Sequence, residues 1–228
     1  MIQRSFSVYL SIVLLVLFLS FSVPAQKTAA PKPDPKPTPS IFGKNLIKNG
    51  GAETGNGSGW TNSDELKTFR YDGGWGDAWL VTPPNHGDNY FYAKVSKESP
   101  VTVFGQKIDV ASIAGEVDSN SVDYSLDSWY GIRAGASVRL IAAFFGADGK
   151  PIKSSAEADD ATEKITAANR PDDTGMVEKT HAGRVPVGTR SIQVTLEFSL
   201  FEIKNENDGD TALADNLSFV LTRKAENH

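Results

Sequence analysis

Aromatic side chains are the residues of this sequence whose types and spacing best suggest a binding site. Trp75, Trp79 and Tyr90 lie close together in a stretch rich in glycine and proline. Trp129 falls on the strand face opposite to Tyr124, so it points outward if Tyr124 points into a core. Aromatic rings pack against the C–H faces of sugars while polar neighbours hydrogen-bond the hydroxyls. These four residues predict a carbohydrate site, although packing also explains each tryptophan taken singly.

Residues for the common kinds of catalysis form no recognisable pattern. His86, His181 and His228 lack metal-ligand spacing with a second histidine or cysteine, and the chain has no cysteine nucleophile. Acidic residues are numerous, but nothing selects two of them as the carboxylate pair of a glycoside hydrolase. We therefore expect no enzyme activity. A cleft holding two carboxyl groups about 5 to 10 Å apart would reverse this expectation.

The first 40 residues have the composition of an export signal followed by a spacer. A positive start, an apolar run over residues 8–21 and small residues at positions 23 and 25 predict a signal peptide at residues 1–25. The alternative is a retained anchor, but the run is shorter than the roughly 20 residues that cross a bilayer. Residues 26–40 alternate proline with lysine and predict an extended linker.

The remainder predicts one domain at residues 41–224 with a short tail at 225–228. Without cysteine, an exported domain relies on its core or on a metal rather than on disulfides. The net charge of −5, with both signs interspersed, argues against a nucleic-acid partner. We expect a secreted, periplasmic or cell-surface protein with no membrane span after signal cleavage.

Period-two alternation of apolar residues predicts an all-β domain. Ile192, Val194, Leu196 and Phe198 share one face of a half-buried strand, and similar patterns recur along the chain. Many short strands separated by turns predict a two-sheet antiparallel β-sandwich of the jelly-roll type. Residues 155–170 lack an apolar stripe and predict a surface loop. The predicted strands are residues 45–49, 66–71, 90–95, 101–110, 122–130, 138–144, 176–184, 191–201 and 217–221.

The two ends of the domain carry matching motifs. The domain opens with NLIKNGGAE at residues 45–53, soon reaches Gly59-Trp60, and closes with ADNLSF at residues 214–219. These segments resemble the opening and closing motifs of the galactose-binding-like jelly-roll superfamily, which includes bacterial carbohydrate-binding modules. The resemblance implies a jelly roll that binds a polysaccharide or glycan without catalysis, with Trp60 in the core. It leaves the ligand open, because one fold serves many functions.

The same resemblance implies a structural Ca²⁺ ion that ties the opening segment to the closing one. Glu53 and Asp215 occupy the motif positions of its acidic ligands, and Asp88 is a weaker candidate. Calcium takes six to eight oxygen ligands, which backbone carbonyls near these residues would complete. The alternative is that both carboxylates cap turns or accept hydrogen bonds from the backbone.

Two functions therefore remain in competition. The first is an exported, non-catalytic carbohydrate-binding-like module. The alternative is a structural or adhesive envelope protein whose β-sandwich binds a protein partner. Exposed aromatic residues on one sheet would favour the first, and a flat apolar patch of several hundred Å² would favour the second.

Overall fold

The computed structural model describes residues 40–73, 82–133, 135–152, 165–166, 175–200 and 210–224. The chain divides between residues 39 and 40, and all described residues belong to the second unit. The predicted signal peptide, and the predicted linker apart from Ser40, thus lie outside the described residues. Among the described residues, no helix has the length and apolar character needed to cross a bilayer.

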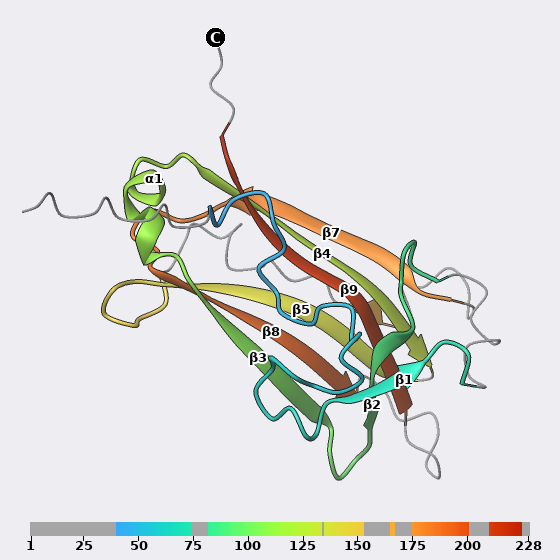
Figure 1. Ribbon diagram of the computed structural model, residues 1–228. Helices are drawn as coiled ribbons and strands as arrows, with labels where there is room; N and C mark the ends of the chain where they lie inside the picture. The colour runs from blue at the N-terminus through green and yellow to red at the C-terminus, as the bar shows by residue number, and fades with distance from the viewer. Residues whose placement is uncertain are drawn as a thin grey trace, which may run out of the picture. The chain divides into compact units, whose positions relative to one another are not determined.

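The described residues are mostly β-strands, with one short helical segment (Figure 1). The 3₁₀ turn η2 (Ala111–Ile113) and helix α1 (Ala114–Asp118) follow the third strand. Neither was predicted, because so short a helix carries no apolar periodicity. The strands are β1 (Lys67–Arg70), β2 (Asn89–Val95), β3 (Val101–Asp109), β4 (Val122–Arg133), β5 (Ala136–Phe145), β6 (Ile165–Thr166), β7 (Val177–Arg184), β8 (Ser191–Leu200) and β9 (Asp210–Arg223).

The strands form two antiparallel sheets. One has the order β1-β2-β9-β4-β7 and the other has the order β3-β8-β5-β6. From β2 to β9, each strand lies in the sheet opposite to the strand before it, except for β6, which follows β5 in the same sheet. This is the double Greek-key connectivity of a jelly roll. The strand β1 is an addition at the edge of the first sheet. The predicted all-β, two-sheet antiparallel sandwich is confirmed.

The core lies between the sheets and follows the predicted alternation. Ile192, Val194, Leu196 and Phe198 of β8 are each fully buried. Trp60 is 5% exposed and packs edge-to-face on Phe91, so it belongs to the core as predicted.

A bulge between β4 and β9 decides which side chains reach the outer face of the five-stranded sheet. Asp127 pairs with Ser218 and Trp129 pairs with Asp215, so Ser128 alone faces two residues of β9. Asn216 supplies the extra residue and adopts a left-handed backbone with φ of 48°, which asparagine tolerates better than most residues. The bulge places Asp215 on the outer face while Leu217 and Phe219 return to the core.

The strand predicted at residues 45–49 is wrong, because this segment forms turns. Its one bridge joins Asn45 to Val220. The Asn45 Oδ1 accepts hydrogen bonds from the backbone N–H groups of Ile47 at 2.9 Å and Phe219 at 3.0 Å. Such side-chain bonds compete with a strand ladder, and they dock the opening segment against β9 instead.

Candidate functional site

The outer face of the five-stranded sheet carries an apolar cluster separate from the core. Tyr90, Met176 and Leu213 are buried at its base. Tyr71, Tyr92 and Trp129 pack on that base and are partly exposed. Phe69, which is 36% exposed, lies opposite Tyr90 in the register of β1 and β2. We call Phe69, Tyr71, Tyr90, Tyr92 and Trp129 the aromatic face.

The strands set the spacing of these rings. Phe69 lies with its ring centre 6.2 Å from Tyr90 and 5.7 Å from Tyr92. The ring of Tyr71 is 4.8 Å from that of Tyr90. Trp129 lies farther across the sheet on β4, beside the β9 strand that carries Leu213. The face therefore extends across several strands rather than along one.

A hydrogen bond fixes the position of Tyr71. Its hydroxyl donates to Asp215 Oδ2 at 2.7 Å and lies 3.5 Å from Met176 Sδ. Its ring packs on His86 with 4.1 Å between ring centres. Burial, then the neighbouring Asp215 carboxylate, raises the pKa of Tyr71, so its phenol stays protonated and remains a donor.

The predicted ligand-binding residues have different outcomes. Trp129 is partly buried in the outer cluster while Tyr124 is in the core, so the prediction of opposite faces is confirmed. Tyr90 is 1% exposed and supports the face from below, so its predicted contact with a ligand stays a prediction. Trp75 and Trp79 lie outside the described residues.

The sequence reading missed Phe69 and Tyr92 as members of the face. Both belong to strands that were predicted correctly, β1 and β2. In β2, Phe91 faces the core, so its neighbours Tyr90 and Tyr92 must face outward. The alternation therefore contained the signal, but sequence alone does not say that these strands lie beside the one carrying Trp129.

Glu53 holds a turn of backbone at the edge of the aromatic face. Its carboxylate accepts hydrogen bonds from the N–H groups of Asp88, at 3.0 and 3.1 Å, and of Asn89, at 2.9 Å. Gly87 permits this approach, since its φ is +71° and a Cβ there would lie 2.4 Å from Glu53 Cδ. Glu53 therefore accepts backbone hydrogen bonds, and its role as a calcium ligand stays a prediction.

Asp215 is fully buried and receives hydrogen bonds from neutral donors, the Tyr71 hydroxyl and the Asn216 N–H, the latter at 2.7 Å. Burial raises the pKa of Asp215 to about 7. The two donors oppose that rise, and the negative charge of Glu53 adds to it.

Glu53 and Asp215 meet around one glycine. A Cβ placed on Gly51 would lie 3.7 Å from Asp215 Oδ1, 3.8 Å from Asn216 Oδ1 and 3.8 Å from Glu53 Cγ. The Asp215 carboxylate, the Asn216 amide oxygen and the aliphatic part of the Glu53 side chain thus border the space beside Gly51. Oxygen donors of this kind fit Ca²⁺. Among the described residues no group of three or more His, Cys, Asp or Glu could hold a metal, so carbonyl oxygens would have to complete the shell.

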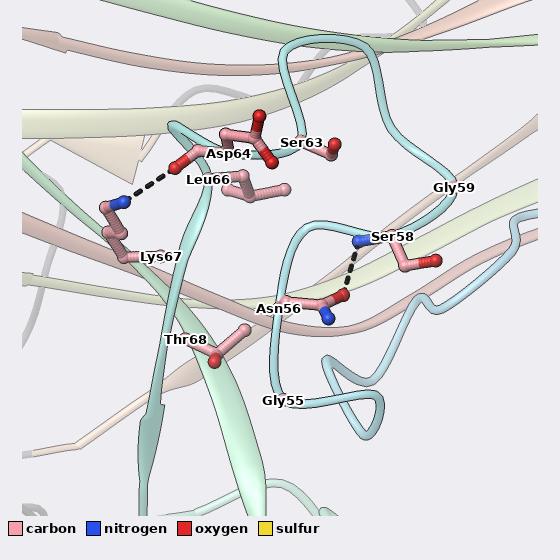
Figure 2. Close-up of a pocket in the computed structure, with 9 residues that line it drawn as sticks. All are labelled: Gly55, Asn56, Ser58, Gly59, Ser63, Asp64, Leu66, Lys67 and Thr68. Atoms are coloured by element: carbon pink, nitrogen blue, oxygen red, sulfur yellow. Dashed lines mark hydrogen bonds between the residues drawn. The ribbon is translucent and has the colours of Figure 1, made fainter.

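A polar pocket of about 540 Å³ opens beside the edge strand β1 (Figure 2). Figure 2 shows the turn at residues 55–59 on one side and the segment at 63–68 on the other, where Lys67 Nζ donates to the Asp64 carbonyl. A second pocket of about 580 Å³ includes Asp109 in its lining. Each of these two pockets is lined by one carboxylate, so neither has the pair that glycoside hydrolysis needs. The first is lined by Gly55, Asn56, Ser58, Gly59, Ser63, Asp64, Leu66, Lys67 and Thr68.

No protein-family model matches the chain, and the comparison with curated proteins also finds no match. Solved structures do match. A "Family 16 Carbohydrate Binding Module-2" is 18% identical, with a TM-score of 0.50 over 77% of this chain and 99% of its own. A cyclase from Fischerella sp. TAU is 12% identical, with a TM-score of 0.52 over 78% of this chain and 96% of its own. A cellulose-specific module, CBM28, is 12% identical over 81% and 96% of the two chains, with a TM-score of 0.41.

At these identities the likenesses concern the fold alone. The domain is a β-sandwich like that of carbohydrate-binding modules, as the motifs at its two ends predicted. The same fold also occurs in a cyclase, so the fold by itself does not decide between binding and catalysis.

Proposed function

We propose that the protein is an exported, non-catalytic module that binds a glycan on its aromatic face. The observation that carries this proposal is the placement of Phe69, Tyr71, Tyr92 and Trp129 together on the outer face of one sheet, on a buried apolar base. Sugar rings stack on such side chains through their C–H faces. The likeness of the fold to a carbohydrate-binding module supports the same function.

Polar groups beside these rings suit sugar hydroxyls. Glu178 lies opposite Trp129 on β7 and is exposed, and Lys67 lies opposite Tyr92 on β1. Tyr71 is fixed by Asp215 before any ligand arrives, so its ring loses little freedom on binding. A preorganised surface of this kind favours binding without chemistry.

We also propose that a structural Ca²⁺ ion binds between Glu53 and Asp215, with the Asn216 side-chain oxygen nearby. The ion would neutralise two neighbouring carboxylates and join the opening turn to β9. Calcium at 100 times its dissociation constant would add about 2.7 kcal/mol to the stability of the domain. Export through a signal peptide at residues 1–25, to the outside of the cell or to its envelope, is the part of the proposal that rests on sequence.

One observation favours the alternative of a protein-binding envelope protein. Val101 and Val103 are 52% and 44% exposed on β3, the edge strand of the four-stranded sheet. Apolar residues on a sheet edge offer a contact for another protein. This surface lies on the sheet opposite the aromatic face, so substitutions distinguish the two functions.

The test is affinity electrophoresis of the purified chain in gels that contain single soluble polysaccharides. Trp129→Ala and Tyr92→Ala should abolish the retardation, while Val103→Ala serves as an exposed control on the other sheet. Trp75→Ala and Trp79→Ala would show whether those residues also contribute. Retardation that survives both face variants would refute the proposed site, and its absence for every polysaccharide with folded protein would favour a protein partner.

A further inference from the structure

Two exposed lysines lie beside the aromatic face. Lys67 of β1 lies directly opposite Tyr92 of β2 in the register of the sheet. Lys94 follows Tyr92 by two residues on the same strand, so its side chain projects from the same face. Both lysines are exposed. Lys67 Nζ donates to the backbone carbonyl of Asp64 at 2.6 Å, which engages one of the three N–H groups of its ammonium.

Charge is distributed unevenly among the described residues of this face. Two acidic residues, the half-buried Asp127 of β4 and the exposed Glu178 of β7, lie beyond Trp129. Glu53 lies at the edge of the face, but its carboxylate accepts hydrogen bonds from the N–H groups of Asp88 and Asn89. Asp215 is buried under Tyr71. The part of the face formed by β1 and β2 therefore combines the rings of Phe69 and Tyr92 with two ammonium groups, although the net charge of the chain is −5.

This combination matches an acidic sugar. In a uronic acid the ring keeps a C–H face that stacks on an aromatic side chain, while the carboxylate projects from the ring edge. A ring that stacks on Tyr92 would bring that edge toward Lys67, which lies opposite Tyr92 on β1, or toward Lys94, which lies two residues along β2. An ammonium group then pairs with the carboxylate through a charge-assisted hydrogen bond.

We infer that the glycan bound by this protein is an acidic polysaccharide whose uronate carboxylates pair with Lys67 and Lys94. The inference rests on the proposed function, because it names the class of glycan that the aromatic face receives. Exposed ion pairs are individually weak, so removal of both lysines should lower the affinity by about tenfold. The loss should be largest at low salt, where screening is weakest.

The experiment is isothermal titration calorimetry of the full chain with oligogalacturonate and with its methyl ester, which has the same sugar rings without charge. Lys67→Ala/Lys94→Ala is compared with Lys44→Ala/Lys107→Ala, which removes the same charge from exposed positions elsewhere. We expect the wild type to bind the acid at least tenfold more tightly than the ester. We expect the first double variant to lose that preference and the second to keep it.

Equal binding of acid and ester, or equal losses in the two double variants, would overturn the inference. Binding of neutral glycans alone, abolished by Trp129→Ala, would also overturn it while leaving the proposed function intact. Tight binding of dextran sulfate but not of oligogalacturonate would assign the lysines to sulfate esters and overturn the uronate assignment. Absence of binding to acidic and neutral glycans alike would refute the proposed function together with the inference.

Discussion

Raising the pH of a calcium-free solution from 5 to 8 should destabilise the domain through Asp215. Burial raises the pKa of Asp215 in the folded protein to about 7, whereas an aspartate in an unfolded chain has a pKa of about 3.9. Between these values the folded state holds a proton that the unfolded chain has lost. Stability therefore falls as the pH rises toward 7 and levels off above it.

The size of this effect follows from the two pKa values. The free energy of unfolding should decrease by about 2.5 kcal/mol between pH 5 and pH 8, given about 1.4 kcal/mol per pH unit below the folded-state pKa. For a domain of this length that loss lowers the midpoint of thermal unfolding by roughly 5 to 10 °C. Calcium should reverse the trend, because it binds the ionised carboxylates and thereby favours loss of the proton.

The assay is a set of thermal melts at pH 5, 6, 7 and 8 in chelator, for the wild type and for Asp215→Asn. Asparagine does not titrate. Its one oxygen can still accept from the Asn216 N–H, while its amide nitrogen replaces Oδ2 and can donate to the Tyr71 hydroxyl oxygen. The replaced hydrogen bond changes stability equally at every pH, so the difference in pH dependence between the two proteins isolates the titration of Asp215. Parallel pH profiles would refute the reasoning about its burial. Melts that calcium leaves unchanged at pH 8 would instead refute the calcium site while leaving the titration argument standing.

Three further substitutions test how the structure is held together. Gly87→Ala should lower the free energy of unfolding by about 1 to 3 kcal/mol, because alanine must adopt a left-handed backbone there and its Cβ meets the Glu53 carboxylate. The control Gly115→Ala in α1, where a Cβ meets no neighbouring atom, should be neutral or slightly stabilising. Denaturant titration of both variants measures the difference. Phe198→Ala should lower the free energy of unfolding by about 3 to 5 kcal/mol, since this fully buried ring packs edge-to-face on Phe104. A loss no larger than that of the exposed control Val103→Ala would contradict the burial of Phe198 in the core. Gln106→Ala should lower the free energy of unfolding by about 1 to 3 kcal/mol, because the Gln106 side chain accepts from the Lys48 N–H at 2.9 Å and donates to the Lys48 carbonyl at 2.7 Å. An unchanged midpoint of chemical unfolding would show that water replaces these hydrogen bonds.

The alternation of apolar residues predicted most of the fold because each strand face is set by local order. The runs that contain Val138 and Ile192 became β5 and β8, and their inward residues are buried as expected. The strand predicted for the opening segment was wrong because the Asn45 side chain binds the backbone of β9 at a residue 174 positions away in the sequence. Periodicity carries no information about such a bond.

The candidate site was predictable in its residue types but not in its assembly. Trp129 could be placed on an outward face, yet only the strand order β2-β9-β4 brings it near Tyr92, since these three strands are not consecutive along the chain. The resemblance of the closing motif predicted Asp215 as a calcium ligand. In the structure, the bulge at Asn216 turns this carboxylate toward Tyr71.

The proposed calcium ion and the Tyr71 hydroxyl would share the carboxylate of Asp215, which would couple stability to glycan binding. A cation near Gly51 would hold the carboxylate ionised, and an ionised carboxylate is the stronger acceptor for the Tyr71 hydroxyl. The ring of Tyr71 is part of the aromatic face, so the ion would also hold that ring in place. In Tyr71→Phe the ring remains without its donor. Comparing the calcium dependence of glycan affinity in Tyr71→Phe and in the wild type therefore separates this coupling from a purely structural effect of the ion.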